Sequence, residues 1–262
     1  MRITIKSEKN KVILHMKYLV LITFFFFSFQ NLVAKEKVIA KIPEASGIVY
    51  SEQSNTLFVV NDEGTIYELT LKGKTLREKK LGKLDLEAVT IDNDKNRLLV
   101  ANEEKDEIII LNIDDFSIIK KMKIKGKYKG NKIIKKGKDG IEGLTLYKDK
   151  IYASNQSNKP YPKNDSSVIV ILDYKDKKSL KIKDIINHGY KDIAGLCFYQ
   201  DYLYFVSDDA NLLIKYDITA KKVVKEYKLS KKHAQEGITF DKKGRLFIAD
   251  DNGQILKIKI NE

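Results

Sequence analysis

The sequence predicts an all-β protein, a five-bladed β-propeller, from three observations. A five-residue motif, consisting of an acidic or small residue, a small residue and a short apolar run, begins at residues 46, 87, 142, 194 and 236. The copies therefore begin 41, 55, 52 and 42 residues apart, and a period of about 40–50 residues with several strands per unit is typical of a propeller. No convincing segment of helical periodicity interrupts the repeats.

Each repeat predicts four short strands in a fixed order. The motif begins the first strand, which in a propeller lines the central channel. A second apolar run ends in polar residues, and its copies span residues 57–62, 98–103, 151–156, 203–209 and 246–251. The third runs span 65–71, 107–113, 168–172, 212–218 and 254–260. Four repeats have a fourth run, at 76–81, 118–124, 180–185 and 223–229, so a complete unit is a four-stranded blade.

The fifth repeat lacks a fourth strand, because only residues 261 and 262 follow its third run. The apolar run 38–42 precedes the first repeat and belongs to none. We therefore expect this N-terminal strand to complete the last blade and close the ring, since an open ring leaves unpaired edges that promote aggregation. Six blades would require a degenerate repeat within residues 116–139. The predicted propeller is a single domain over residues 36–262.

Residues 1–34 have the pattern of a signal peptide or a membrane anchor. Met16 and Lys17 precede an apolar run over residues 18–29, the length of a signal-peptide core and short for a membrane span. Ala34 offers a cleavage site, although Leu32 is unfavourable two residues before it. Two alternatives stay open: the segment is retained as a membrane anchor, and translation starts at Met16 rather than Met1. The segment predicts export, either to the periplasm or to a membrane-anchored position in the cell envelope.

The strongly basic charge does not predict nucleic-acid binding. The formal net charge is +13, yet arginine occurs only at positions 2, 77, 97 and 245. Because base and phosphate recognition favours arginine, we expect no nucleic-acid partner. The densest lysine run comprises Lys120, Lys121, Lys123, Lys125, Lys127, Lys129, Lys132, Lys135, Lys136 and Lys138. The favoured interpretation is a solvated edge strand whose lysines block edge pairing. The alternative is a patch for anionic lipid, phosphate or an acidic polymer.

Cys197 is the only cysteine, so no intramolecular disulfide can form. It occupies the fourth position of its motif, where the other copies have Val49, Thr90, Thr145 and Thr239. This position is expected to face a neighbouring blade. We therefore predict a buried, inert thiol rather than a nucleophile.

Acidic and amide side chains gather where the first strands begin and the second strands end. Glu87, Glu142 and Glu236 begin three inner strands, and Ser46 and Ala194 begin the other two. The second strands end with Asn61, Asn102, Asn155, Asp208 and Asp250. Because adjacent strands are antiparallel, we expect all these side chains to converge on one mouth of the channel. Such oxygen donors, without patterned His or Cys, suit Ca²⁺ or Mg²⁺ rather than Zn²⁺. The alternative is a polar channel lining that binds water and joins the blades.

Other polar residues near this mouth are assigned structural roles. Asp85, Asp139 and Asp192 precede inner strands, and we expect them to bind turn amides. His188 and His233 lie in loops that lead to inner strands. We expect both to be surface residues, a proton carrier at the mouth being the alternative.

A family resemblance is carried by five phrases, at residues 44–48, 57–69, 85–90, 233–238 and 246–251. Together they resemble the SdiA-regulated family of bacterial envelope proteins over about residues 36–262. The resemblance implies a β-propeller with an N-terminal membrane signal and no established activity. Members commonly have Gly after the inner-strand Glu. Here Ala88 replaces this Gly in the second repeat and Ala194 replaces the acid in the fourth, and both depart from a fully acidic ring. A more distant similarity to calcium-dependent propeller lactonases and phytases implies a metal at the axis.

Two classes of function follow. The favoured one is an exported, envelope-associated binding or scaffold module that holds a small ligand, a metal or an envelope protein at the channel mouth, since no base–nucleophile pair is recognisable. The alternative is a Ca²⁺-dependent hydrolase of the lactonase, esterase or phosphatase type. There the cation would polarise an oxygen and a carboxylate would take a proton from water. We expect a monomer, with any membrane association through the N-terminus.

Overall fold

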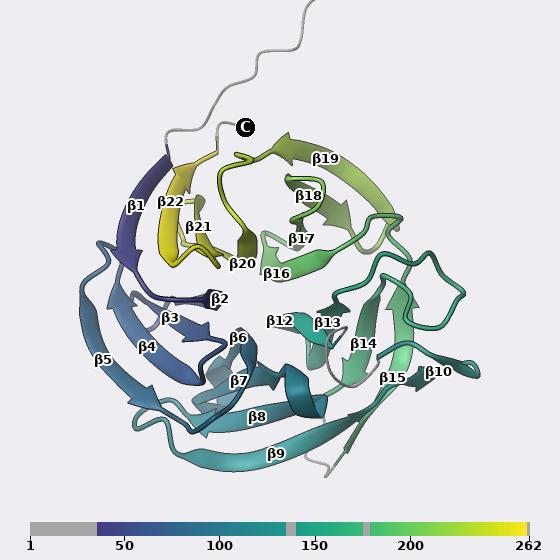
Figure 1. The fold of residues 1–262 in the computed structure, drawn as a ribbon, viewed down its shortest axis with the longest axis horizontal. Coiled ribbons are helices and arrows are strands. Elements are labelled where there is room, and N and C mark those ends of the chain that lie inside the picture. The colour runs from purple at the N-terminus through teal and green to yellow at the C-terminus, as the bar shows by residue number, and fades with distance from the viewer. Residues whose placement is uncertain (1–35, 135–139, 175–178, 261–262) are drawn as a thin grey trace, which may run out of the picture. The chain divides into compact units, whose positions relative to one another are not determined.

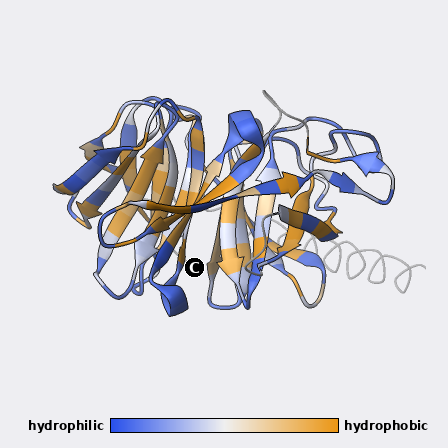
Figure 2. Ribbon diagram, turned by 90° about the horizontal axis from the view of Figure 1, so that it is seen from below, coloured by the Kyte–Doolittle hydropathy of each residue, from blue (hydrophilic) through white to orange (hydrophobic). Residues whose placement is uncertain are grey.

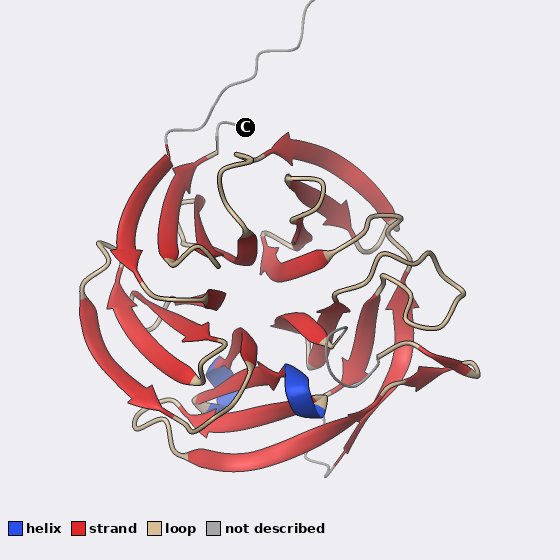
Figure 3. Ribbon diagram, viewed as in Figure 1, coloured by secondary structure: helices blue, strands red, loops and turns tan. Residues whose placement is uncertain are grey.

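The computed structural model describes residues 36–134, 140–174 and 179–260, which belong to one compact unit spanning Lys35–Ile260. This unit is all-β and propeller-like, with strands grouped around a common centre (Figures 1 and 3). Its described residues form 22 strands and two short 3-10 helices, η1 (Asn93–Lys95) and η2 (Glu103–Lys105). None of its helices has the length and apolar character needed to cross a membrane. The predicted signal or anchor, residues 1–34, lies outside the described residues.

Consecutive strands pair as antiparallel meanders. The first contains β2 (Ala45–Ser51), β3 (Thr56–Asn61), β4 (Thr65–Thr70) and β5 (Thr75–Lys80). The second contains β6 (Leu86–Asp92), β7 (Arg97–Asn102), β8 (Glu107–Asn112) and β9 (Ile118–Lys125). The third contains β12 (Ile141–Tyr147), β13 (Lys150–Asn155), β14 (Ile169–Asp173) and β15 (Ser179–Ile186). The fourth contains β16 (Ile193–Tyr199), β17 (Tyr202–Ser207), β18 (Leu212–Asp217) and β19 (Lys222–Lys228). The last contains β20 (Gln235–Phe240), β21 (Arg245–Asp250) and β22 (Gln254–Lys259).

The N-terminal strand β1 (Glu36–Lys41) pairs antiparallel with β22, so the last sheet has the order β1-β22-β21-β20. The first strands of the meanders, β2, β6, β12, β16 and β20, are called the inner strands. Each inner strand contacts the next one along the chain, and β20 contacts β2 again. Figure 1 shows these strands nearest the centre. Segments from both ends of the described chain therefore meet in one sheet.

The lysine-rich strand β9 is not a free edge. It pairs antiparallel with β8 on one side and parallel with β15 on the other, where Lys123–Lys125 stand beside Ser179–Lys181. This parallel pairing joins the second and third meanders into one eight-stranded sheet. The prediction that lysines protect an unpaired edge was therefore wrong for this part of β9. A short hairpin, β10 (Lys127–Tyr128) with β11 (Asn131–Lys132), follows it, while Lys135, Lys136 and Lys138 lie outside the described residues.

The hydrophobic core lies between neighbouring meanders. One cluster joins side chains of the first and second meanders, including Phe58 and Leu98, and ends on Phe116, whose ring meets Phe58 edge-on at 6.0 Å. Similar clusters join the second meander to the third, the third to the fourth and the last to the first. Figure 2 shows apolar residues distributed along the strands and polar residues at their connections. Each meander is thus stabilised mainly by its neighbours, as expected for a repeat architecture.

Two motif positions hold the inner strands together. The second position is small because the strands approach closely: a Cβ on Gly237 would lie 2.6 Å from the Ile48 backbone nitrogen. At the fourth position, Thr239 Oγ1 accepts a hydrogen bond from the Tyr50 N–H (3.0 Å), and Thr90 Oγ1 accepts one from the Leu146 N–H (3.2 Å). Cys197 holds the same position and is buried, as predicted, and burial raises its pKa to about 12.

Candidate functional site

A register shift marks the beginning of every inner strand. In each case the pairing with the following strand slips at the motif, so that its first residue has no partner in the ladder. The residues in this position are Ser46, Glu87, Glu142, Ala194 and Glu236. A β-bulge bends the strand and redirects a side chain. The bulge therefore explains how a residue within a buried strand can point its side chain toward the centre.

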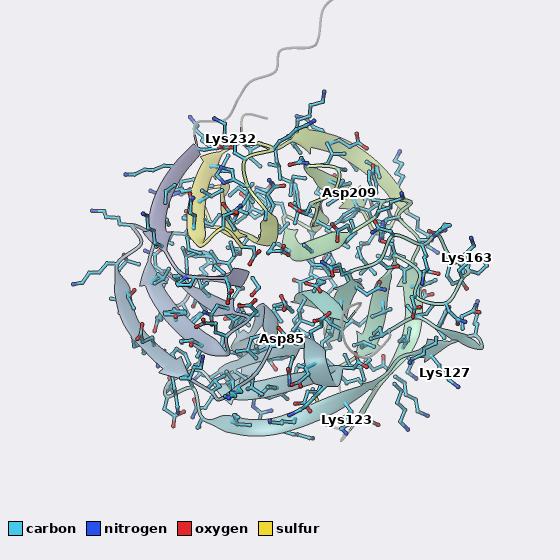
Figure 4. All side chains as sticks on the ribbon, in the orientation of Figure 1. Asp85, Lys123, Lys127, Lys163, Asp209 and Lys232 are labelled. Atoms are coloured by element: carbon cyan, nitrogen blue, oxygen red, sulfur yellow. The ribbon has the colours of Figure 1, made fainter. Side chains whose placement is uncertain are left out.

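A cavity of about 550 Å³ lies at this end of the inner strands. Its lining consists of Ser46, Asp62, Asp85, Glu87, Glu103, Glu142, Gln156, Glu236 and Asp251. Seven of these nine residues carry a carboxyl group, and none carries a positive charge. In a protein with a net charge of +13, seven of the 36 acidic residues thus meet at one place without a basic residue among them. Figure 4 shows Asp85 toward the centre and Lys123, Lys127 and Lys232 at the rim.

Three of the eight predicted site residues, Glu87, Glu142 and Glu236, line this cavity, and the five at the ends of second strands do not. Asn61 instead donates from Nδ2 to the Pro43 carbonyl (3.0 Å) and accepts at Oδ1 from the Thr65 N–H (2.9 Å). Asn155 bonds to the backbone in the same way, through the Ile133 carbonyl and the Val168 N–H. Both amides therefore satisfy the turn that follows their strand.

The other three members of that set have similar partners. Asn102 donates from Nδ2 to Glu107 Oε1 (3.0 Å), and Asp208 accepts at Oδ1 from the Gln235 N–H (2.8 Å). Asp250 accepts at Oδ1 from the Ala234 N–H (3.0 Å). Of these contacts, only the Asp208–Gln235 hydrogen bond joins two meanders, whereas Asn102 and Asp250 bond within their own, so the alternative of inter-blade hydrogen bonds is matched in part.

Sequence reasoning missed four cavity residues by a single position. Asp62, Glu103, Gln156 and Asp251 each directly follow one of the predicted residues. Successive side chains of an extended chain point to opposite sides. The residue that ends the second strand therefore turns to the backbone, and the next one turns to the cavity. The polar pairs Asn61-Asp62 and Asp250-Asp251 could have indicated this arrangement in the sequence. In each pair the first side chain bonds to the backbone and the second faces the cavity.

Asp85, Glu87 and Glu103 form the tightest group, because one carboxylate oxygen from each lies within 4.8 Å of the others. They could hold a metal ion. Asp85 precedes β6, Glu87 occupies its bulge and Glu103 begins η2. Glu103 is positioned by two bonds: its N–H donates to the Asp85 carbonyl (3.0 Å), and its Oε1 accepts from the Gly140 N–H (2.9 Å). Asp85, expected to bind turn amides, instead lines the cavity.

Crowding and burial make it costly for these carboxyls to ionise. Burial, followed by the charge of Glu142, raises the pKa of Glu87 to about 11. Burial and then Glu236 raise the pKa of Glu142 well above its ordinary value. Like charges that share a site cannot all be ionised at neutral pH. Without a cation, the centre of the cluster is therefore expected to retain protons.

The carboxyls around this centre titrate nearer neutrality. Burial raises the pKa of Glu103 to about 7, although the Gly140 N–H acts in the opposite direction. Burial raises the pKa of Asp62 to about 7, with a further contribution from a hydrogen bond to Glu44. Burial and the charge of Asp208 raise the pKa of Glu236 to about 8. A divalent cation would lower all these values by favouring the ionised forms.

His188 and His233, the two histidines among the described residues, lie outside the cavity lining. His188 is only 7% exposed, which contradicts the expected surface position, and burial lowers its pKa to about 4. Its Nδ1 accepts from the Tyr190 N–H (3.1 Å). His233 is partly buried, with Nδ1 2.6 Å from Asp250 Oδ2 and Nε2 3.3 Å from Glu36 Oε2. Of the other predicted turn residues, Asp192 is not part of the lining, and Asp139 lies outside the described residues.

Solved structures support the fold. A glutaminyl cyclase from Myxococcus xanthus superposes with a TM-score of 0.64 at 12% identity, covering 86% of this chain and 94% of that one. A luciferin-regenerating enzyme superposes with a TM-score of 0.52 at 16% identity, covering 86% and 76% of the two chains. At such low identity the likeness concerns the fold alone. A comparison with curated proteins finds no match.

The sequence itself identifies the family. The model of the family described as SdiA-regulated matches residues 26–253, which is most of the chain. This match confirms the resemblance carried by the repeated phrases, and the chain therefore belongs to the SdiA-regulated family.

Proposed function

We propose that this protein is an exported binding module of the cell envelope, and that its acidic cavity binds a divalent cation, Ca²⁺ or Mg²⁺. The observation that carries the proposal is the convergence of seven carboxyl groups, without a basic residue, on one cavity. Hard cations such as these prefer several carboxylate and carbonyl oxygens. The export of the protein is proposed from the apolar run at residues 18–29.

We assign the fold as a five-bladed propeller whose N-terminal strand completes the last blade. Support comes from the five motif copies, the five inner strands and the antiparallel pairing of β1 with β22. The stretch 116–139, considered for a sixth blade, contains β9 and the β10–β11 hairpin in its described part. In this assignment the acidic cavity is one mouth of the central channel.

We propose Asp85, Glu87 and Glu103 as the first ligands, because their oxygens already lie within 4.8 Å of one another. Glu142 and Glu236 stand at the equivalent bulges of other inner strands and would complete the site or balance its charge. A bound cation would balance the charge of the ionised carboxylates. Without it the same groups hold protons, so the cation and the protons compete for the same oxygens. The cation is thus proposed as a structural partner of the cavity and as the contact for an anionic or hydroxylated ligand.

A hydrolase is the second candidate, favoured by one observation. Glu142 and Glu236 line the same cavity but are not members of the Asp85, Glu87 and Glu103 group, so a carboxylate that does not hold the cation is available as a general base. In this candidate the cation would polarise a carbonyl or phosphoryl oxygen of a lactone, ester or phosphate, and a carboxylate would take a proton from water. The binding module remains our conclusion, because the lining offers no nucleophile paired with a base.

Thermal unfolding of the full chain, after chelation and again with added Ca²⁺ or Mg²⁺, tests the proposed cation. A ligand that binds only the folded state contributes about 2.7 kcal/mol at 100 times its dissociation constant. For a domain of this size that corresponds to a rise in melting temperature of about 5–10 °C. No rise at millimolar cation would contradict the proposal.

Glu103→Gln and Glu104→Gln form a matched pair for this test. Both residues belong to η2, but Glu103 lines the cavity and the side chain of Glu104 is exposed. We expect Glu103→Gln to weaken the response to cation at least about tenfold in apparent affinity, and Glu104→Gln to leave it unchanged. Equal responses in both variants would show that the cation acts elsewhere.

A further inference from the structure

A lysine-rich rim lies on the outer surface where β9 and β15 pair. We define it as the exposed residues Lys123, Lys125, Lys127, Lys129, Lys132 and Lys181. Figure 4 shows Lys123 and Lys127 on the same side of the molecule, at the outer strands. We propose that this rim rests on a membrane surface that contains anionic lipids.

The sheet register places like charges next to each other. In the parallel pair, Lys125 is the partner of Lys181, and both side chains are exposed while their neighbours Ile124 and Leu180 are buried. Like charges at paired positions of a sheet are destabilising. Since β15 occupies this side of β9 at Lys123–Lys125, the lysines there do not block an open edge. Their cost to the fold therefore indicates a partner outside the fold.

Other outer strands are also basic, but β5 and β19 each contain an acidic residue and carry a net charge of +2, against +4 for β9. β5 contains Glu78, and its Arg77 Nε lies 2.6 Å from Glu68 Oε2. β19 contains Glu226 among its lysines. β9, with the sequence IIKKMKIK, has four lysines and no acid. The examples of β5 and β19 show that an outer strand of this fold can form with acidic residues among its basic ones.

The hairpin after β9 adds an aromatic residue to the charged surface. Tyr128 is partly exposed between Lys127 and Lys129, and its hydroxyl donates to Asp184 Oδ1 (3.2 Å). The Lys129 ammonium lies 5.3 Å from the centre of the Tyr128 ring. Tyrosine and lysine, each with an apolar body and a polar end, suit the interface between headgroups and water.

The chemistry of the rim favours lipid over a polymer recognised group by group. All six positive residues are lysines, which act as point charges, whereas paired contacts to individual phosphates favour arginine. Lysines near an anionic leaflet gain from its surface potential without a specific contact.

Lysine-by-lysine acylation tests the proposal on the full chain. The protein is reconstituted in vesicles of phosphatidylcholine, alone or mixed with phosphatidylglycerol, and modification is read by mass spectrometry. On anionic vesicles we expect the rim lysines to react roughly fivefold more slowly. The exposed lysines of β19, Lys222, Lys225 and Lys228, should react equally on both. Protection should vanish in about 1 M salt, where the screening length falls to about 3 Å.

Charge variants provide the second measurement. Lys125→Gln combined with Lys181→Gln should reduce the protection of the remaining rim lysines, and Lys225→Gln combined with Lys228→Gln should not. Equal acylation on the two kinds of vesicle would overturn the proposal, as would equal protection of the rim and of β19. Protection by soluble polyglutamate but not by anionic vesicles would assign the rim to an acidic polymer and also overturn it.

Discussion

The two ends of the inner strands differ in chemistry although the same five strands build both. At the beginning of these strands lies the acidic cavity of about 550 Å³. At their other end lies a cavity of about 300 Å³ that contains no acidic cluster of this kind. Its wall includes apolar residues such as Leu144, Leu196 and Ile238, and the fourth motif residues Thr90 and Thr239.

The difference teaches that one short motif performs separate tasks along its length. Its first residue, freed by a bulge, lines the acidic cavity in four of the five copies. Its second residue is small, so that neighbouring strands can approach. Its fourth residue, where it is Thr90 or Thr239, accepts a hydrogen bond from the next inner strand. The candidate site thus lies at the bulged end, and the hydrogen bonds between inner strands lie at the regularly paired end. The following changes separate the two ends, from the largest expected effect to the smallest.

Gly237→Ala should damage both ends, because it acts where two inner strands approach closely. The new Cβ would lie 2.6 Å from the Ile48 nitrogen and 2.7 Å from the Ser46 carbonyl oxygen, both backbone atoms. We expect the free energy of unfolding, measured in denaturant, to fall by about 3 kcal/mol. As a control, Gly130→Ala adds a Cβ with nothing within 4 Å, at a φ of +86°, and should cost only about 1 kcal/mol from backbone conformation. If the two variants lost the same free energy of unfolding, the close approach of the strands at Gly237 would not be the cause of the loss.

The acidic end should make the cation-free protein less stable as pH rises. The pKa of Glu236 is raised from 4.5 to about 8, so the folded state holds its proton where the unfolded state has lost it. The resulting stability is complete below pH 4.5 and is lost as pH rises through about 8. Because the carboxyls of the cluster repel one another jointly, only part of this pKa shift belongs to Glu236. We therefore expect this residue to contribute about 2 kcal/mol to the free energy of unfolding at low pH.

Glu236→Gln removes the titrating group and measures this contribution. At pH values above about 8 the cation-free variant should be more stable than the unaltered protein, and near pH 4 the two should be similar. Saturating Ca²⁺ should flatten the pH dependence of the unaltered protein if the proposed cation is bound. A stability that rises with pH in the absence of cation would contradict the protonated cluster.

Much of the fold could be predicted because its signals are local and repeated. Motif copies at a regular spacing, and apolar runs ended by polar turns, predicted the order of the strands. The parallel pairing of β9 with β15 could not be predicted in this way, since it joins Lys123–Lys125 to residues more than 50 positions away. No local pattern distinguishes a lysine-rich edge from a lysine-rich strand with a distant partner.

The candidate site was predicted in part for a related reason. Glu87, Glu142 and Glu236 belong to the repeat and could be found by its spacing. Asp85 is outside the motif, and the choice between Asn102 and Glu103 depends on which side chain turns inward. A bulge locally changes the alternation of inward- and outward-pointing side chains. Which residue at the end of the partner strand points inward therefore has to be taken from the structure.

Thr239→Val should affect only the regularly paired end, and by the smallest amount. Valine has nearly the size of threonine, so the loss is mainly that of the hydrogen bond that Thr239 Oγ1 accepts from the Tyr50 N–H, together with its contact to the Cys197 thiol. Removing one such bond costs about 1 kcal/mol in the free energy of unfolding. The exposed Thr219→Val should cost little and is the matched control. Since the acidic cavity begins at the opposite end of the strand, the response to Ca²⁺ should be unchanged in both variants. A weakened response in Thr239→Val alone would show that the two ends are coupled along the inner strand.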